Sequence, residues 1–312
     1  MATFTPRSSG LLKNASTRTL VAGDLKAVFL PGHGMLGASL CHKGVEILRR
    51  VENLETAAAK GSTAGIPFLY PWANRLASFG YRAAGLEITL DPSSPLLHLD
   101  AKGLPMHGVP WSLLAWELPE AKRDFLMARL DWSRSDLLAM FPFRHRLELT
   151  AILHPDALTL EMTLVAGPEG PVPVSFGFHP YFGFPDLSRG QWRLKLPPMK
   201  RLVLDQRGIP SGEEEPFNGF NAQLGDTGFD DSFALTAEQA SFSVSGARRQ
   251  VTVEFLAGYS HAQVFAPPES DYIALEPMTA PTSALTSGRG LRIVDAGGKF
   301  RAMFRIRVEA VS

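Results

Sequence analysis

Four short segments carry the side chains that could transfer protons. Each places a histidine, a glutamate or an arginine beside proline, glycine or an aromatic residue, where an apolar, strand-like run ends. The segments are residues 70–75 (YPWANR), 106–111 (MHGVPW), 177–182 (GFHPYF) and 274–279 (ALEPMT). Imidazole, carboxylate and guanidinium groups held by rigid turns are what a pocket needs to move protons on a neutral polar ligand. Together the four segments predict a binding or catalytic cleft.

His179 and Glu276 are the strongest candidates for an acid and a base. His179 follows an alternating run and precedes Pro180, so its side chain should project from the end of a strand. Glu276 lies between an apolar run and a proline, and partial desolvation there raises the pKa of a carboxyl towards the value of a general base. The ordinary alternative is a structural histidine and a glutamate at the rim that forms a salt bridge with Arg75. The Tyr181 ring could stack on a ligand, although core packing is the commoner use of such rings.

The supporting residues are weaker signals when they are taken one at a time. Asn74 and Arg75 leave a segment stiffened by proline, and a guanidinium offers several donors to hydroxyl or carboxylate oxygens. His107 precedes a glycine, which lets a ligand or another backbone approach closely. A surface arginine and a loop histidine are each the commoner outcome in isolation. Asp230 is weaker still, because it adjoins Asp231 and paired aspartates in loops are usually solvated.

The elements that carry these segments are predicted to be strands. Apolar and polar residues alternate with period two, which puts one face of each strand on a core and the other in water. The clearest alternating runs are 147–149, 158–164, 192–196, 251–255 and 304–308. Helical candidates are few, with one weak turn at 55–60 and an ambiguous stretch at 123–140. We therefore expect an all-β fold, a large antiparallel β-sandwich with few short helices, as a single domain over residues 1–312.

Composition restricts the partners of this chain. The 31 basic and 31 acidic residues cancel to a formal net charge of zero, which argues against nucleic acid or an anionic membrane surface. There is no run of about 18 apolar residues and no signal-peptide core near the start. A single cysteine, Cys41, fits a reducing compartment. These features predict a cytoplasmic location and a small-molecule ligand, with no membrane or nucleic-acid partner.

The motifs resemble those of the aldose 1-epimerases, also called galactose mutarotases. The resemblance runs from about residue 29 to about residue 308, and its motifs occur in the family's order at similar spacing. They are Asn74-Arg75, His107-Gly108, His179-Pro180-Tyr181-Phe182, Asp230 with Phe233 three residues later, and Glu276-Pro277. One such motif is nonspecific, whereas five in order are specific. The resemblance implies a large antiparallel β-sandwich that interconverts the α and β anomers of a free aldose without a metal or an organic cofactor.

The resemblance also implies a role for each residue. Glu276 matches the general base that takes the proton from the anomeric hydroxyl, and His179 matches the general acid that protonates the ring oxygen. His107 matches a histidine that hydrogen-bonds the sugar near the anomeric centre. The expected substrate-binding residues are Asn74, Arg75, Trp111, Tyr181 and Asp230. A carboxylate of Glu276 or Asp230 close to His179 should raise the pKa of this histidine and keep it protonated at neutral pH.

Two departures from the family pattern leave the identity of the sugar open. Asp231 stands where galactose-type members often carry histidine, and Ser283 stands where the family often shows asparagine or aspartate. A branch of the superfamily acts on hexose 6-phosphates and needs extra positive charge. Arg75, Arg82 and Arg193 are available for that purpose, but no basic cluster stands out in the sequence. We therefore favour a free sugar as the substrate.

Two readings from other functional classes are weaker. The first is a carbohydrate-binding or sensor protein without turnover, but binding alone does not need both His179 and Glu276. The second is a metal-dependent hydrolase or lyase that uses His107, His179 and a carboxylate. The sequence has no close ligand pair of the His-x-His or His-x-x-x-His kind, which argues against a metal site. The oligomeric state is expected to be a monomer or a homodimer.

Overall fold

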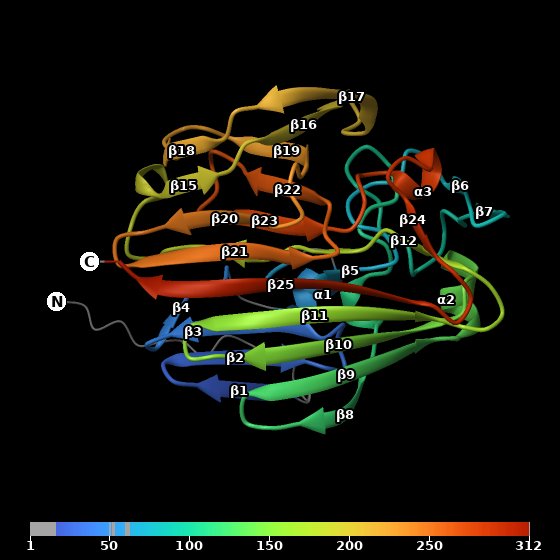
Figure 1. Cartoon of the computed structure of the whole chain (residues 1–312), viewed down its shortest axis with the longest axis horizontal. Helices are drawn as coiled ribbons and strands as arrows, with labels where there is room; N and C mark the ends of the chain where they lie inside the picture. Colours follow the sequence, from blue (N-terminus) through green and yellow to red (C-terminus); the bar gives the residue numbers. More distant parts are fainter. Residues whose placement is uncertain (1–16, 50, 52–53, 60–62, 312) are drawn as a thin grey trace.

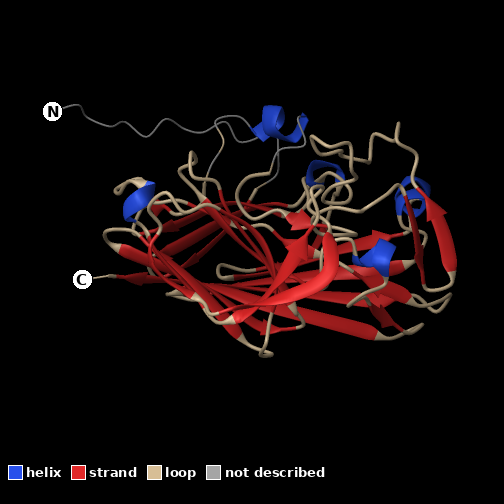
Figure 2. Ribbon diagram, turned by 90° about the horizontal axis from the view of Figure 1, so that it is seen from above, coloured by secondary structure: helices blue, strands red, loops and turns tan. Residues whose placement is uncertain are grey.

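The structure is a computed structural model that describes residues 17–49, 51, 54–59 and 63–311. Strands dominate it, and three short α-helices interrupt them (Figure 1). Two large sheets lie over each other as curved layers, and the helices lie at their periphery (Figure 2). Every pairing between named strands is antiparallel within the described part of the chain. The predicted all-β sandwich is therefore confirmed.

The larger sheet has nine strands and contains most of the alternating runs. Its spatial order is β18 (Phe220–Gln223), β15 (Arg193–Leu196), β20 (Ala240–Ser245), β21 (Arg249–Ala257), β25 (Lys299–Ala310), β11 (Ala157–Ala166), β10 (His145–Leu153), β9 (Phe125–Trp132) and β8 (Glu117–Ala121). In β10, buried residues alternate strictly with half-buried ones, as the sequence pattern predicted. Registers such as Leu149 opposite Met162 keep the apolar side chains of neighbouring strands on one face.

The second sheet has eight strands and carries the functional segments. Its order is β17 (Pro210–Phe217), β16 (Met199–Leu204), β19 (Phe229–Ala234), β22 (His261–Ala266), β23 (Ile273–Met278), β13 (Gly177–Phe178) and β5 (Phe68–Leu69), and β14 (Tyr181–Phe182) also pairs with β23. The strands at the β5 end are only two residues long. The backbone therefore leaves the sheet at the β5 end. The polar segments lie at these exits from the sheet.

The remaining elements are small. A four-stranded N-terminal sheet and two two-stranded sheets complete the strands: β1 (Arg18–Ala22), β2 (Leu25–Leu30), β3 (Leu36–His42), β4 (Val45–Glu46), β6 (Gly80–Ala83) with β7 (Leu86–Thr89), and β12 (Val172–Val174) with β24 (Arg292–Val294). The α-helices are α1 (Leu54–Ala59), α2 (Ser135–Met140) and α3 (Ala284–Ser287), and single 3-10 turns occur at Trp111–Leu113 and Arg189–Gln191. No described helix is long and apolar enough to cross a membrane.

The two segments with helical signals have different structures. The weak turn predicted at 55–60 is the helix α1, although residue 60 lies outside the described residues. The ambiguous stretch 123–140 divides into strand β9 and helix α2. In β9 the side chains of Leu126, Ala128, Leu130 and Trp132 all face the core, and this period-two pattern decides for a strand.

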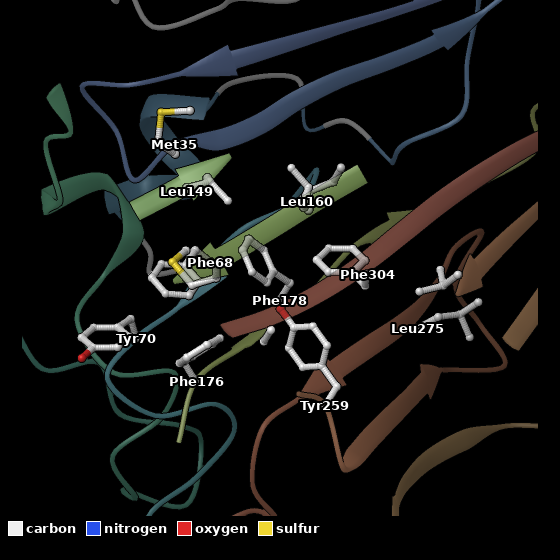
Figure 3. Close-up of a cluster of buried hydrophobic side chains, with 14 of the residues drawn as sticks. Met35, Phe68, Tyr70, Leu149, Leu160, Phe176, Phe178, Tyr259, Leu275 and Phe304 are labelled. Carbon is white, nitrogen blue, oxygen red and sulfur yellow. The ribbon is translucent and has the colours of Figure 1, made fainter. Parts of the chain in front are cut away.

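An apolar core fills the space between the two large sheets. Phe178 of β13 packs on Phe304 of β25 with 5.1 Å between ring centroids, so this contact joins the two layers. Leu149 and Leu160 from one layer and Leu275 from the other complete the region drawn in Figure 3. Burying each such side chain stabilises the fold by about 1.5–3 kcal/mol. The main core is one contiguous cluster with two small separate clusters besides it, and the assignment of residues 1–312 to one domain stays a prediction.

The second sheet therefore has one face in the core and one face outside it. In β22, Ala262 and Val264 belong to the core. Successive side chains of a strand point to opposite faces, so His261, Gln263 and Phe265 lie on the outer face. This outer face carries a row of polar side chains across β19, β22 and β23, namely Ser232, Gln263 and Glu276.

A buried polar contact supports the segment 70–75 at its first residue, Tyr70. The Tyr70 hydroxyl donates to His145 Nε2, and Nδ1–H of the same imidazole donates to the Phe143 carbonyl at 2.6 Å. Burial lowers the pKa of His145 to about 4. The neutral ring is therefore part of the folded state.

Acid should weaken the fold through His145. Between its unfolded pKa of ~6.5 and its folded pKa of about 4, the unfolded chain binds a proton that the folded chain does not. Stability is therefore lost as the pH falls through this window, by about 2 kcal/mol at pH ~5 for this one group. Urea unfolding at pH 7 and pH 5 should show a smaller pH-dependent loss in His145→Gln than in the wild type. The exposed His154→Gln is the control, and an equal loss in all three proteins contradicts the assignment.

Candidate active site

The acid and base candidates meet on the outer face of the second sheet. His179 follows the end of β13, and Glu276 lies in the middle of β23. The distance from His179 Nε2 to Glu276 Oε1 is 3.1 Å, and the two side chains are only 6% and 2% exposed. The imidazole and the carboxyl can therefore exchange a proton directly.

Tyr181 fixes the orientation of the His179 ring. The two rings stack with 4.2 Å between centroids and 17° between planes. The Tyr181 hydroxyl lies 3.1 Å from His179 Nε2 and also bonds to Thr63 Oγ1. Residues 179 and 181 are neighbours on one face because β13 and β14 continue in extended geometry through Pro180. Tyr181 thus contacts the acid candidate, whereas its neighbour Phe182 lies in the core.

His107 reaches the same place from a loop with unusual backbone geometry. Its ring meets the His179 ring edge-on, with 5.5 Å between centroids. Both His107 and Gly108 have positive φ, at 61° and 68°. A Cβ on Gly108 would lie 2.1 Å from the Tyr70 carbonyl oxygen, so only glycine allows this approach. The turn is closed by the His107 amide, which donates to the Asn74 carbonyl at 2.8 Å.

Arg75 is held in place by a buried carboxylate. Its Nε donates to Asp100 Oδ2 at 2.6 Å, and its Nη1 donates to Asn74 Oδ1 at 3.1 Å. The Arg75 and Asp100 side chains are 18% and 6% exposed. Asp100 in turn accepts hydrogen bonds from the amides of Lys102 and Leu104 through Oδ1. The guanidinium is thus oriented by Asp100 and is not a free surface charge.

Asp230 belongs to a polar row that crosses three strands. Register places Ser232 of β19 opposite Gln263 of β22, and Gln263 opposite Glu276 of β23. Directly opposed side chains of antiparallel strands share one face. Gln263 Nε2 donates to Asp230 Oδ1 at 2.8 Å, and Ser232 Oγ donates to Gln263 Oε1. Asp230 is therefore fixed beside the base candidate by two residues that are themselves 3% exposed.

Burial dominates the electrostatics of the central groups. It raises the pKa of Glu276 well above the usual value, and the Asp230 carboxylate raises it further, against a smaller lowering by Arg75. Burial lowers the pKa of His107 to about 3, with a further contribution from Arg75. His107 is thus a neutral imidazole that can accept or donate one hydrogen bond.

The expected rise in the pKa of His179 is wrong. The Glu276 carboxyl lies close to His179, as expected. Burial nevertheless lowers the pKa of His179, and His107 lowers it further. An imidazolium facing a carboxylate and a neutral imidazole facing a carboxylic acid hold the same number of protons. Burial favours the uncharged form of this pair.

Several buried polar atoms at this place have no hydrogen-bond partner among the described residues. They are His107 Nδ1, His179 Nδ1 and Glu276 Oε2. A buried polar group without a partner costs about 1–3 kcal/mol. Orphaned atoms that gather in one place therefore point to a hydroxylated ligand that completes their hydrogen bonds.

Not every predicted residue joins this group. Trp111 packs with Leu30 and Leu36 in a satellite cluster and shares with His107 a cavity of about 20 Å³. Its contact with a sugar stays a prediction. Asp231 points to the opposite face from Asp230 and forms an ion pair with Arg201 at 3.2 Å.

Ser283, the second departure from the family pattern, has a structural role. It adopts a left-handed backbone with φ of 64°, a conformation in which asparagine and aspartate are enriched. Its Oγ accepts a hydrogen bond from the Ala77 amide at 2.9 Å. Ser283 thus ties the loop after β23 to the segment that carries Arg75.

The arginines considered for a phosphate group do not converge. Arg82 lies in β6, where it pairs with Glu87, and both side chains are about three-quarters exposed. Arg193 is an exposed residue of β15 in the nine-stranded sheet. Arg75 alone lies beside the acid–base pair. This arrangement favours an uncharged ligand.

Sequence reasoning missed Gln263, Ser232 and Asp100. Gln263 carried a usable signal, because a polar residue between Ala262 and Val264 interrupts a run that is otherwise apolar. Asp100 carried no such signal, since it lies in a turn-rich stretch and contacts a residue 25 positions away. Within the described residues, no three His, Cys, Asp or Glu side chains are arranged to hold a metal ion.

The fold and the site together define an antiparallel β-sandwich with a buried imidazole–carboxyl pair on one sheet face. The chain belongs to the aldose 1-epimerase family, whose model matches residues 27–307. This match confirms the resemblance seen in the motifs. Family membership implies epimerase chemistry.

The chain is also similar in sequence and in structure to known proteins. The chain is 25% identical over 308 residues to YihR of Escherichia coli K12, an uncharacterised protein, and the match covers 94% of this chain and 93% of YihR. A galactose mutarotase-like protein from Clostridium acetobutylicum superposes with a TM-score of 0.82 at 17% identity, covering 95% of this chain and 99% of that one. A putative aldose 1-epimerase from Escherichia coli K12 gives 0.75 at 20% identity, with 96% and 100% covered. The structural likenesses show the shared fold.

The Arg75–Asp100 pair should contribute to stability because it is largely shielded from water. Asp100→Asn keeps an acceptor for the two amides but loses the charge opposite Arg75, at an expected cost of about 2 kcal/mol. Urea unfolding measures the loss. Glu87→Gln is the matched control, because the Arg82–Glu87 pair is solvated and its loss should change little. Equal effects of the two variants would contradict the assigned role.

Proposed function

We propose that this protein is an aldose 1-epimerase that interconverts the α and β anomers of a free aldose by opening and reclosing the ring. The observation that carries the proposal is the 3.1 Å contact between His179 Nε2 and Glu276 Oε1 in a chain of this family. An acid and a base beside one anomeric centre are sufficient for this reaction. The orphaned polar atoms around the pair support a ligand rich in hydroxyl groups.

The proton transfers follow from the two side chains. Glu276, as carboxylate, takes the proton from the anomeric hydroxyl, while His179, as imidazolium, gives its proton to the ring oxygen. The bond between C1 and the ring oxygen breaks, and an open-chain aldehyde forms. Rotation about the C1–C2 bond presents the other carbonyl face, and the two residues reverse their roles as the ring closes. Each positioned proton transfer contributes roughly 10²–10⁴-fold to the rate.

The charged form of the pair arises from the neutral form without any change in proton count. A proton moves from Glu276 to His179 along their contact when hydrogen bonds from the ligand stabilise the two charges. Arg75 favours the ionised carboxyl electrostatically. The neutral His107 and the Tyr181 hydroxyl lie beside the His179 ring and can accept or donate hydrogen bonds near the anomeric centre. Asp230 and Gln263 are placed to hold hydroxyl groups further along the sugar.

Glu276→Gln should abolish most turnover and keep sugar binding. The amide fills the same volume and can still hydrogen-bond, but it cannot accept the hydroxyl proton, so we expect a fall of at least about 10²-fold in kcat. Polarimetry of freshly dissolved sugars, with the spontaneous rate subtracted, measures turnover, and calorimetric titration measures binding. Comparing glucose, galactose, arabinose and xylose with glucose 6-phosphate separates free from phosphorylated substrates.

The matched control for this substitution is Glu254→Gln, a half-buried glutamate of β21 in the other sheet. Normal mutarotation is expected for Glu254→Gln. Near-normal turnover by Glu276→Gln would refute the assignment of the base. Sugar binding with no turnover in the wild type would instead favour a binding or sensor protein.

The pH dependence of kcat/KM should be bell-shaped. Below the lowered pKa of His179 the pair gains a second proton and no base remains. Above the raised pKa of Glu276 the pair loses its shared proton and no acid remains. The acid limb should therefore lie below the ordinary pKa of histidine, and the alkaline limb above that of glutamate. A rate independent of pH, after subtraction of the spontaneous reaction, would contradict the assignment of His179 and Glu276 as an acid–base pair.

A further inference from the structure

Rings from three other elements surround the imidazole of His179. Tyr181 of β14 stacks on it with 4.2 Å between centroids, and His107 meets it edge-on from the loop after β7. Phe265 of β22 is a third neighbour, also edge-on, with 6.3 Å between centroids and 80° between planes. Aromatic pairs attract each other in such stacked and edge-on arrangements. The position of the His179 ring therefore depends on how firmly Tyr181 and Phe265 are held.

Tyr272 contacts both of these supporting rings. Its ring centroid lies 5.5 Å from that of Tyr181 at an interplanar angle of 73°, and 6.2 Å from that of Phe265 at 43°. The two supporting rings come from β14 and β22, which pair with opposite sides of β23. Among the described residues, Tyr272 makes no ring contact with His179 itself. Tyr272 therefore acts on the imidazole through the two rings that it contacts.

The strand geometry of β23 places Tyr272 on the same face as the base candidate. Tyr272 comes directly before β23, and positions 272, 274 and 276 alternate onto the outer face that carries Glu276. Register places Ala274 opposite Tyr181 on one side and opposite Phe265 on the other. Ala274 has only a methyl group, so it does not separate the two larger rings from Tyr272. The small residue at position 274 thus allows the three rings to pack together.

Arg49 places its guanidinium over the Tyr272 ring. Cζ of Arg49 lies 4.1 Å from the centroid of Tyr272 and 5.8 Å from that of Tyr181. Both distances are within the ~6 Å range over which a guanidinium is attracted to an aromatic face. The guanidinium forms no ion pair with any described residue, and the Arg49 amide donates to the Tyr181 carbonyl at 2.9 Å. Arg49 is therefore fixed to the tyrosines through both its backbone and its side chain.

A large cavity borders this group of side chains. Arg49 and Asp271, the residue before Tyr272, line a cavity of about 750 Å³. His179 is not among the described residues that line it. Open space offers no partner atoms to a side chain, so the packing of Tyr181 on this side has to come from Tyr272 and Arg49. These two residues are therefore the outermost support of the His179 ring on the side of the cavity.

We propose that Tyr272 and Arg49 are positioning residues for the general acid of this protein. They hold Tyr181 and Phe265, and these two rings hold the imidazole of His179 in its reactive orientation. The proposal rests on the proposed epimerase function, because the orientation of an imidazole limits turnover only if that imidazole transfers a proton. Both positioning residues act through other side chains, so their substitution should change kcat more than KM.

The test compares substitutions of the two residues with a matched control. Tyr272→Leu removes the ring, and Tyr272→Phe keeps the ring without the hydroxyl. Arg49→Met removes the cation, and Arg49→Lys keeps it. Both residues are partly exposed, so each variant should fold, and urea unfolding verifies this. Phe125→Leu is the control, because Phe125 is a half-buried ring of β9 in the other large sheet with Lys122 Nζ 5.5 Å from its centroid.

Polarimetry measures kcat and KM for the free aldose that the wild type converts fastest. We expect Tyr272→Leu to lower kcat at least about tenfold, because a displacement of ~1 Å at a reacting group can cost about 10²-fold. KM should stay within about twofold of the wild-type value. Arg49→Met should lower kcat in the same direction, whereas Tyr272→Phe and Arg49→Lys should keep most of it. An unchanged kcat, a change confined to KM, or an equal fall in Tyr272→Leu and Phe125→Leu would overturn the positioning role and leave the epimerase function intact.

NMR of isotope-labelled imidazole nitrogens gives a second readout. Burial lowers the pKa of His179 in the wild type. The titratable groups that face its ring are Glu276 from β23, Tyr181 from β14 and His107 from the loop, and all three remain in Tyr272→Leu. Loss of the Tyr272 ring admits water, which weakens the effect of burial. The pKa of His179 should therefore rise towards the ordinary value of histidine, and its resonances should titrate at higher pH.

The two readouts separate positioning from function. The NMR titration does not depend on turnover, so a shift in Tyr272→Leu that is missing in Phe125→Leu supports the positioning role even if the wild type converts no aldose. Identical titration of His179 in Tyr272→Leu and in the wild type would overturn the role. Absence of mutarotation in the wild type together with a shifted titration would instead reject the epimerase function alone.

Discussion

The structure of the site depends on the burial of an imidazole against a carboxyl on the outer face of a sheet. Away from water, His179 and Glu276 are each destabilised in their charged forms, and their 3.1 Å contact places each beside a polar partner. A buried pair of this kind is costly unless the surrounding groups hold it rigidly. Much of the neighbouring structure can be understood as meeting that requirement.

The surrounding residues supply rigidity in different ways. Tyr181 stacks on the His179 ring, and the Ser232–Gln263–Asp230 hydrogen bonds hold the row beside Glu276. The loop of His107 is fixed by a glycine that no other residue can replace without a clash. Beneath these groups, the interleaved aromatic residues of the two sheets form a close-packed core of low compressibility.

The departures from the family pattern have structural explanations. Asp231 faces away from Asp230 because adjacent residues of a strand point to opposite sides, so its identity does not change the surface beside Glu276. Ser283 occupies a left-handed turn and accepts a hydrogen bond from the Ala77 amide. In this chain the two positions therefore contribute an ion pair in one case and a contact between loops in the other.

The sequence by itself determined five alternating strands of the nine-stranded sheet, the sandwich class and the motifs that contain His107, His179 and Glu276. Period-two alternation reports directly which face of a strand is buried, and proline and glycine mark where strands end. It could not determine the pKa of His179, because burial and the neighbouring carboxyl act in opposite directions and only their geometry decides between them. Nor could it find the contact of Asp100 with Arg75 or that of Gln263 with Asp230, since these depend on which distant residues the fold brings together. Register between β19, β22 and β23 is a property of the folded chain, and it decides which side chains form one site.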